Sequence, residues 1–321
     1  MAAQPVLCLA GATATGKTSI AISIADALGA EIINADSRQV YADFPGICAQ
    51  PTEAEKKRAP HHLYGMLATS EAINAGEWCR MAYATVCQVL ARGHVPLLVG
   101  GTGMYFHSLL HGILPIPPID PAIRSSLESR IEAFGPLALY DELKAFDLAY
   151  AETIHPHDRQ RIVRAHEVYE QTGHTISWWR KQASLQRPFC YGPLYVLLAD
   201  RLWLAPRIET RIERMLEEGA LDEARAAYAH CSDPDAPGWT GIGCAELMAY
   251  LLGRIRLDEA QALWVKHTKA YAKRQNTWFR GRSEAQFFDP AKPQAVVEAA
   301  IREWRRLIDE REDCYAGKAA E

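Results

Sequence analysis

The chain has 321 residues, with 35 Lys and Arg against 39 Asp and Glu, so its formal net charge is −4. Hydrophobic residues make up 49% and charged residues 23%, which are ordinary globular values and exclude wholesale disorder. The length suffices for one large domain or two smaller ones. The acidic balance argues against a protein that binds nucleic acid through bulk charge alone.

Features that would direct the chain to a membrane or out of the cell are not evident in the sequence. No apolar run approaches the ~20 residues of a membrane span, and no basic leader precedes the short apolar run near the first residue. Eight cysteines without a CxxC pair are typical of reduced thiols rather than of disulfides or a zinc site. We expect a cytoplasmic protein, and we expect it to act as a monomer.

The first hundred residues predict alternating strands and helices. Short apolar runs predict strands at 6–10, 31–35 and 95–99, and helices are expected at 19–28 and 77–92. Strand–helix–strand order with short links indicates a parallel sheet flanked by helices.

From residue 114 the pattern changes. The segment LPIPPIDP is too rich in proline to continue either element, so it predicts a crossing between domains. Charged helices are expected over 120–185, an apolar run at 194–199 predicts a return to the sheet, and helices follow near 205–230, 258–280 and 294–311. We therefore expect an α/β core at residues 1–114 and 194–321, interrupted by a helical insertion domain at 115–193.

A phosphate-binding motif lies between the first predicted strand and helix. Residues 11–18 read GATATGKT, which matches GxxxxGK[ST] in the context that this motif requires. Backbone N–H groups of such a loop cradle phosphate oxygens, the lysine neutralises the terminal phosphate and the final hydroxyl ligates Mg²⁺. This predicts a P-loop NTPase-like core that uses Mg²⁺ and binds diphosphate through Gly11, Ala12, Thr13, Ala14, Thr15, Gly16, Lys17 and Thr18, with Thr18 on the metal.

Two polar residues follow other strands of the same predicted sheet. Asp36 ends the second strand and Thr102 follows the third. The carboxyl ends of parallel strands meet at one edge, so both residues should converge with the phosphate loop in one crevice. Each residue could instead cap a helix, and that alternative stays open. Asp36 could hold Mg²⁺ as in a nucleotide hydrolase, but no second acid then remains to activate water, so ATP hydrolysis is not supported.

A helix near 205–217 carries three arginines beside its apolar face. Arg211 has like charges, Arg207 and Arg214, at helical spacing and no carboxylate there, which is unfavourable unless an anion fills the position. This predicts a phosphate contact. The alternative of solvated arginines that pair with distant acids also stays open.

The predicted helix near 258–280 is both aromatic and cationic. Trp264, Tyr271 and Trp278 recur every seven residues, which is more typical of core packing than of base stacking. Residues 269–282 contain five cations and no acid, and residues 159–164 add three arginines, so both segments predict contacts with a phosphate backbone. The histidines of the segment HPHDRQRIVRAHEVYEQTG and the His61–His62 pair lack metal spacing with acids or thiols and are interpreted as structural or solvated.

Taken together, the motifs resemble the bacterial tRNA dimethylallyltransferases over nearly the whole chain. The segments that carry the resemblance occur in the family's order and are GATATGKT, NADSRQVY, PHHL, LLVGGTGMYF, DRQRIVRAHEVYEQTG, RIETRIERMLEEG and AKRQNTWFRG. The chain departs from the family pattern in the phosphate loop at Ala12 and Thr15, and elsewhere at Cys48, Gln50 and His166, and at Cys244 and Ala245 within the segment Gly243–Glu246.

The resemblance implies transfer of a dimethylallyl group from dimethylallyl diphosphate to N6 of the adenosine 3′-adjacent to the anticodon, in tRNAs that read codons beginning with U. The exocyclic amine is a poor nucleophile, so a base must take its proton, and Asp36 matches the family's general base. Thr102 and Arg211 match catalytic positions on the diphosphate. The anticodon stem-loop would be bound by Ser37, Arg38, Gln39, Arg124, Gln160, Arg161, Ile162, Val163 and Arg164.

Three other functions remain as alternatives. A P-loop kinase of a nucleotide or small metabolite would use Asp36 to activate a hydroxyl. An adenylate isopentenyltransferase would share the core motifs but act on a free nucleotide. A nucleotide-dependent RNA-binding protein without catalysis would leave Asp36 and Thr102 unexplained.

Overall fold

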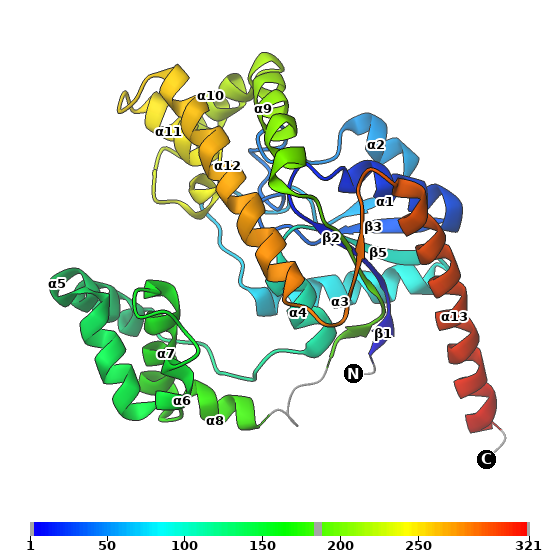
Figure 1. Cartoon of the computed structure of the whole chain (residues 1–321), viewed down its shortest axis with the longest axis horizontal. Helices are drawn as coiled ribbons and strands as arrows, with labels where there is room; N and C mark the ends of the chain where they lie inside the picture. The colour runs from blue at the N-terminus through cyan, green and yellow to red at the C-terminus, as the bar shows by residue number, and fades with distance from the viewer. Residues whose placement is uncertain (1–2, 183–187, 320–321) are drawn as a thin grey trace. The chain divides into compact units, whose positions relative to one another are not determined.

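The computed structural model describes residues 3–182 and 188–319, with side chains described as far as residue 309. Its centre is a six-stranded sheet of order β4-β3-β5-β2-β7-β8 in which every neighbouring pair is parallel (Figure 1). The strands are β2 (Leu7–Gly11), β3 (Ala30–Asn34), β4 (His61–His62), β5 (Val95–Gly100), β7 (Leu194–Leu197) and β8 (Ala285–Phe288). Two short strands, β1 (Gln4–Pro5) and β6 (Cys190–Tyr191), pair separately.

Helices alternate with these strands along the chain, and the last helix follows them. They are α1 (Lys17–Leu28), α2 (Glu53–Arg58), α3 (Ala75–Ala91), α4 (Gly103–His111), α5 (Pro121–Phe146), α6 (Leu148–Ala151), α7 (Arg159–Thr172), α8 (Ile176–Lys181), α9 (Arg201–Glu217), α10 (Ala220–His230), the 3-10 helix η2 (Pro237–Thr240), α11 (Cys244–Leu251), α12 (Leu257–Arg280) and α13 (Pro293–Ala319). Within the described residues, none of these helices is long and apolar enough to cross a membrane.

The sheet is buried between helices, as its sequence predicts. Every residue of β2, β3 and β5 is buried, which suits strands that are covered on both faces. α1 and α13 pack on one face through a shared apolar cluster, and α3 and α4 lie on the other (Figure 1). The predicted α/β fold with a parallel sheet flanked by helices is confirmed.

Most element boundaries fall within a few residues of the predicted ones, with two informative differences. The helical region expected near 205–230 is two helices, because Gly219 adopts a left-handed φ of 103° between α9 and α10. The edge strand β8 was not predicted. Its four residues do not alternate strictly between buried and exposed positions, and none of them is fully buried.

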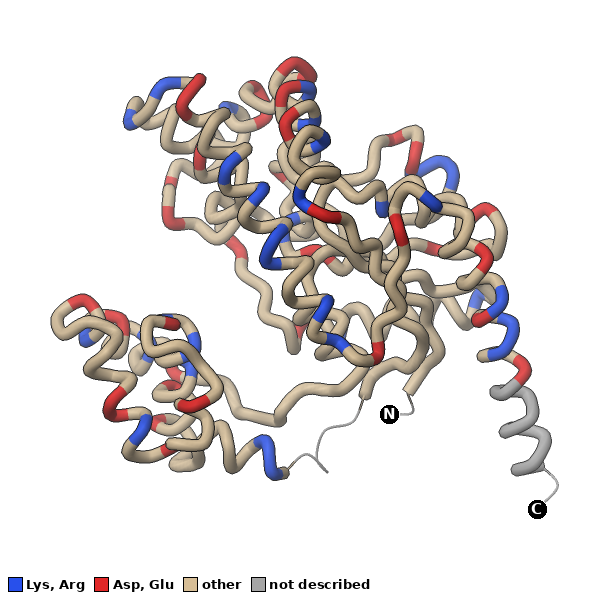
Figure 2. The backbone as a smooth tube through the Cα atoms, viewed as in Figure 1, with Lys and Arg blue, Asp and Glu red and all other residues tan. Residues whose placement is uncertain are grey.

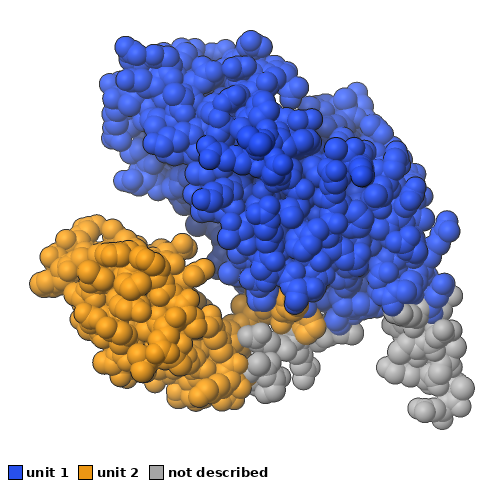
Figure 3. Space-filling model, in the orientation of Figure 1, with its two compact units in different colours: residues 1–110, 189–321 blue, residues 111–188 orange. Residues whose placement is uncertain are grey.

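The chain divides into two compact units, residues 1–110 with 189–321 and residues 111–188 (Figure 3). The smaller unit comprises α5 to α8, and its own core includes Leu127, Leu143 and Ile162. The segment returns to the larger unit beside the point where it left, because the backbone N–H of Phe189 donates to the carbonyl of Leu109 at 2.9 Å. The two segments of the larger unit are thus joined by a main-chain hydrogen bond.

Helices α9 to α12 form a second layer of the larger unit. They share an apolar cluster with the loop that follows β3, including Phe44, Ile212, Trp239 and Trp264. This packing brings α9 and α12 against the carboxyl edge of the sheet, where the predicted site residues lie.

Candidate active site

The phosphate loop joins β2 to α1 in the conformation that its sequence requires. Gly16 adopts a left-handed φ of 81° at the N-cap of α1. The buried Thr15 hydroxyl donates to the carbonyl of Ala12 at 2.8 Å and closes the loop. The loop leads directly into the amino end of α1, where backbone N–H groups and the helix dipole favour an anion.

Lys17 is folded onto the loop itself. Its ammonium donates to the carbonyls of Gly11 and Ala12, at 3.0 and 2.8 Å. Burial lowers the pKa of Lys17 from 10.5 to about 8, while nearby Asp36 partly raises it and Arg211 lowers it further. A bound anion would favour the charged form of this lysine.

Asp36 is held by a tight turn after β3. The buried Asn34 accepts from the backbone N–H of Asp36 at 2.8 Å and donates to the carbonyls of Asp36 and Leu63, both at 3.0 Å. Asp36 Oδ1 accepts from the backbone N–H of Arg38 at 2.9 Å. No helix begins within residues 37–52, so Asp36 is not a helix cap.

Thr102 links the loop after β5 to the loop after β3. Its backbone N–H donates to the carbonyl of Ala35 at 3.1 Å. Its hydroxyl accepts from the backbone N–H of Ser37 at 2.9 Å and donates to the Ser37 hydroxyl at 3.2 Å. Asp36 and Thr102 therefore meet at the carboxyl edge of the sheet, as their positions in the sequence predicted.

Helix α12 adds residues that the sequence did not single out as part of the site. The buried Gln275 accepts from the backbone N–H of Thr13 through Oε1 and donates to the carbonyl of Gly101 through Nε2, both at 2.9 Å. The hydroxyl of Tyr271 lies near Thr102, and burial with nearby Asp36 raises the pKa of that tyrosine. The seven-residue aromatic spacing located Tyr271 but indicated only core packing.

Two cavities open beside the phosphate loop. The inner cavity, of about 400 Å³, is lined by Thr13, Asp36, Ser37, Arg38, Ile47, Cys48, Ile208, Arg211, Ile212, Met215, Thr240, Ile242, Trp264, Thr268, Tyr271 and Arg274. The outer cavity, of about 650 Å³, is lined by Ala14, Gly16, Thr18, Pro45, Gly46, Ala49, Gln50, Thr52, Glu55, Pro206, Arg207, Thr210, Arg211, Arg214, Met215 and Glu218. Arg211 and Met215 border both cavities.

Arg211 differs from its two neighbours in α9. Among the described residues, no carboxylate lies within ion-pair distance of it, and its Nη1 lies 3.5 Å from the Thr13 hydroxyl. Arg214 pairs with Glu218 at 3.6 Å, and the Arg207 guanidinium stacks 3.7 Å from the centre of a tryptophan ring. Burial and nearby Arg214 lower the pKa of Arg211.

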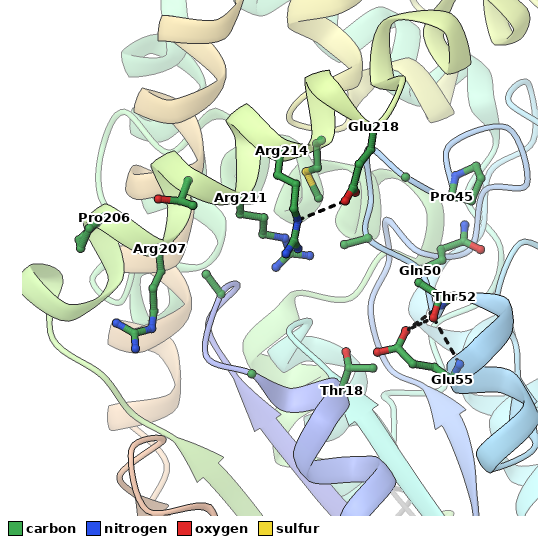
Figure 4. A pocket seen from close by; sticks show the side chains of 16 residues that line it. Thr18, Pro45, Gln50, Thr52, Glu55, Pro206, Arg207, Arg211, Arg214 and Glu218 are labelled. Carbon is green, nitrogen blue, oxygen red and sulfur yellow. Dashed lines mark hydrogen bonds and ion pairs between the residues drawn. The ribbon is translucent and has the colours of Figure 1, made fainter.

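Figure 4 shows how the outer cavity is bounded. Arg211 and Arg214 extend into it from α9, and Thr18 on α1 lies on the opposite wall. An anion bound there would face the guanidinium groups on one side and the first turn of α1 on the other.

The three residues after Asp36 contribute both to the loop that follows β3 and to the inner cavity. Arg38 lines the inner cavity and donates to Thr240 Oγ1 at 3.1 Å. Gln39 instead donates to the backbone carbonyls of Cys48 and Ala49, at 3.2 and 2.6 Å. Within this group Arg38 and Ser37 line the inner cavity, whereas the Gln39 amide is engaged in holding the loop.

The sites predicted for RNA in the insert are only partly exposed. Ile162 and Val163 are buried in the core of the smaller unit, so their side chains cannot reach an RNA surface. The exposed members are Arg124, Gln160, Arg161 and Arg164. Two of the arginines share the buried Glu167, with Nε of Arg124 at 3.8 Å and Nη1 of Arg164 at 3.0 Å.

Histidines of both units have structural partners. His166, one of the departures from the family pattern, is buried and its Nε2 lies 2.8 Å from the carbonyl of Leu139. His62 Nε2 lies 2.6 Å from a carboxylate oxygen of the buried Glu31. These contacts agree with the structural interpretation of both histidines.

The cationic run in α12 is mostly exposed. Figure 2 shows Lys and Arg recurring along this helix. Lys266, Lys273, Arg274 and Arg280 are exposed, whereas Lys269 forms an ion pair with Glu209 of α9. The exposed cations thus lie on the same helix as Tyr271 and Gln275.

Known proteins resemble this chain throughout its length. It is 56% identical to the tRNA dimethylallyltransferase of Desulfovibrio desulfuricans, over 93% of this chain and 92% of that one. It is 48% identical to the tRNA dimethylallyltransferase of Nitratidesulfovibrio vulgaris strain Miyazaki F, over 92% of each chain.

Solved structures agree. The full-length tRNA isopentenylpyrophosphate transferase of Bacillus halodurans superposes with a TM-score of 0.69 at 29% identity, over 96% of this chain and 99% of that one. A eukaryotic dimethylallyltransferase acting on tRNA gives a TM-score of 0.74 at 25% identity, over 90% of this chain and 74% of that one. A model of the IPP transferase family matches residues 39–282. The family resemblance carried by the motifs is thus confirmed, and the chain belongs to the IPP transferase family.

Proposed function

We propose that this protein transfers a dimethylallyl group from dimethylallyl diphosphate to N6 of the adenosine 3′-adjacent to the anticodon, in tRNAs that read codons beginning with U. One observation carries the proposal: a carboxylate, Asp36, lies at a cavity that is also lined by Thr13 of the phosphate loop and by Arg211, which has no carboxylate partner among the described residues. A general base beside an anion site suits a transfer in which diphosphate leaves while an amine attacks.

The diphosphate would lie against the loop and α9. Loop N–H groups, Lys17 and Arg211 would stabilise the negative charge that develops as the allylic carbon–oxygen bond breaks. The Thr18 hydroxyl, at the first turn of α1 and on the wall of the outer cavity, would hold Mg²⁺, which neutralises diphosphate oxygens when bound. The donor set fits, because a loop that ends in Lys-Thr supplies one positive charge to the diphosphate and one hydroxyl to the Mg²⁺ that the diphosphate carries.

The adenine would enter the inner cavity. Asp36 would accept a proton from the N6 amine as the bond to the allylic carbon forms, which removes the positive charge that would otherwise remain on nitrogen. A base that is stacked in an RNA loop cannot reach an enclosed carboxylate, so it must leave the stack first. The apolar wall formed by Ile208, Ile212 and Trp264 suits the five-carbon chain.

RNA would be held mainly by positive groups outside the cavity. The exposed cations of α12, with Arg38 at the cavity, are available to the phosphate backbone of an anticodon stem-loop. Arg124, Gln160, Arg161 and Arg164 of the insert would make further contacts. The relatives' action on tRNA supports this partner over a free nucleotide.

One assay separates this function from the alternatives. The protein and Mg²⁺ are incubated with labelled dimethylallyl diphosphate in separate reactions that contain unmodified tRNA, AMP or no acceptor, and a parallel reaction supplies labelled ATP. Transfer to the tRNA adenosine is expected. Transfer to AMP alone would instead identify an adenylate isopentenyltransferase, and phosphoryl transfer from ATP without prenyl transfer would identify a kinase.

A further inference from the structure

We propose that Gln275 is a positioning residue that fixes the distance between the phosphate loop and Thr102, and thereby between the departing diphosphate and the general base. The kinetic part of this inference rests on the proposed function. Its structural part does not, because both partners of Gln275 belong to this chain.

The amide joins the two loops directly. Oε1 of Gln275 accepts from the backbone N–H of Thr13 in the phosphate loop, and Nε2 donates to the carbonyl of Gly101 at the end of β5. The side chain is 5% exposed, so water does not compete for these contacts. One buried amide thus uses a donor and an acceptor at once, and losing either partner would leave a buried polar group unpaired.

The sequence makes room for this amide. A Cβ built on Gly101 would lie 2.2 Å from Nε2 of Gln275 and 3.3 Å from Oδ2 of Asp36, so any side chain at 101 would displace the amide. A glycine at this point therefore allows Gln275, Gly101 and the base to lie close together.

Neighbouring residues on the same helix face hold the next residues of the loop. Tyr271 lies at Thr102, and a Cβ on Gly103 would meet the Trp278 ring at 2.2 Å. Positions 271, 275 and 278 follow helical spacing, so one face of α12 contacts three consecutive residues, 101 to 103, which lead from β5 into α4. The polar link across to the phosphate loop is made by Gln275.

A small error in this spacing would affect the reaction and the diphosphate site more than it affects tRNA binding. Rates of group transfer fall steeply when reacting groups are misplaced by about 1 Å. Thr102 also accepts from Ser37, which follows the base, so a shift of the loop after β5 would move the loop that carries Asp36. Loss of the Gln275 contacts is therefore expected to lower kcat, whereas RNA binding on the exposed side of α12 should be unchanged.

The test compares three variants. Gln275→Ala removes both contacts. Gln275→Glu retains an acceptor for Thr13 but places an oxygen against the Gly101 carbonyl. Asn276→Ala is the matched control, because Asn276 is also buried in the same turn and its amide donates to the carbonyl of Ala199 at 2.8 Å, not to the phosphate loop.

In the transfer assay, kcat is expected to fall by roughly 10- to 100-fold in both Gln275 variants, with KM for tRNA changed by less than about twofold. Asn276→Ala should retain kcat within about threefold although it loses a similar buried hydrogen bond. The activity of Gln275→Glu relative to the wild type should rise as the pH falls, because a protonated carboxyl can again donate to Gly101. A merely structural role would lower kcat equally in the control and would give no such pH trend.

A second measurement does not depend on prenyl transfer. Binding of inorganic diphosphate with Mg²⁺ is followed by calorimetry, and the affinity of Gln275→Ala should be lower than that of Asn276→Ala by about tenfold. Wild-type-like diphosphate affinity together with wild-type-like kcat in Gln275→Ala would overturn the inference. Absence of prenyl transfer in the wild type, with the difference in diphosphate affinity intact, would overturn the proposed function instead.

Discussion

Asp36 is held by backbone contacts that do not need its charge. The turn is fixed by Asn34, and Oδ1 accepts from the backbone N–H of Arg38, a role that an amide oxygen can also fill. Asp36→Asn is therefore expected to fold normally while kcat for tRNA prenylation falls by at least ~10², the usual cost of losing a general base. Steady-state kinetics and a thermal melt check the two parts, and near-normal kcat would assign Asp36 a structural role.

Lys17 gives the diphosphate site a pH dependence. In the free protein its pKa is about 8, so the ammonium that is present at pH 7 is lost as the pH rises through 8, and the affinity for diphosphate should fall with it. Between about pH 7 and 9 we expect a loss of roughly tenfold. Lys17→Arg keeps its charge across this range.

Calorimetric titration of both proteins checks this prediction. The ratio of their affinities removes the titration of diphosphate itself, which affects both alike. A constant ratio from pH 7 to pH 9 would contradict the expected titration of Lys17.

Among individual residues, the site residues that could be predicted from the sequence are those that directly follow strands. Asp36 and Thr102 were placed because carboxyl ends of parallel strands share an edge, and the phosphate loop because its motif has a fixed context. Gln275 could not be found in this way, since a glutamine in an amphipathic helix is ordinarily a surface residue. Only the packing of α12 on the loop after β5 gives it two buried partners.

At the scale of elements, a buried carboxylate ties three strands together. Glu31 near the amino end of β3 accepts from Arg92 after α3, at 2.6 and 3.0 Å, and contacts His62 of β4 and His94 before β5, at 2.6 and 2.7 Å. The pKa of Glu31 is lowered to about 2. The hydrogen bonds from Arg92 are the largest cause of this shift, and burial opposes it.

Glu31→Gln should therefore lower the free energy of unfolding by about 2–3 kcal/mol at pH 7. Because the pKa of Glu31 is depressed in the folded state, its contribution is present above about pH 4.5 and is lost as the pH falls toward 2. Urea unfolding at pH 7 and at pH 4 checks the sign, since the difference between variant and wild type should shrink at the lower pH. Glu53→Gln, which breaks the exposed pair with Lys56, is the control and should change little.

Elements with strong patterns were predictable and weak ones were not. The apolar runs of β2, β3 and β5 were recognised because central strands are buried on both faces. The edge strand β8 and the two-residue strand β4 carry no such run, and only pairing with their neighbours defines them. The aromatic spacing of residues 264, 271 and 278 was interpreted as core packing, but the partner of this helix face was set by the tertiary fold.

At the scale of the whole molecule, the charge total and its distribution point in different directions. The net charge of −4 disfavours tight binding through bulk charge, whereas exposed cations recur along α12 and the insert adds Arg124, Arg161 and Arg164. Several of these arginines already pair with acids of the insert, such as Glu128, Asp158 and Glu167. RNA binding would thus depend on shape and on a few phosphate contacts, with a modest dependence on salt.

We expect that the insert, residues 111–188, can be deleted without unfolding the larger unit. Its flanking residues meet in the larger unit, where the Phe189 N–H donates to the Leu109 carbonyl, and its core is formed by its own helices. A variant in which a short Gly-Ser linker joins Leu110 directly to Phe189 should therefore retain the sheet, the phosphate loop, Asp36 and α12. We expect it to unfold cooperatively and to bind diphosphate with Mg²⁺ as the full chain does.

Prenyl transfer to tRNA should respond differently, because the exposed arginines of the insert would be lost with it. KM for tRNA is expected to rise by roughly 10- to 100-fold, in proportion to a few lost phosphate contacts, while the chemical site is unchanged. Steady-state kinetics with tRNA as the varied substrate measures the rise, and the diphosphate titration shows that the remaining unit is intact. If KM for tRNA stayed at the full-length value, the insert would not be an RNA-binding element, and the cations of α12 with Arg38 would have to account for the binding of tRNA.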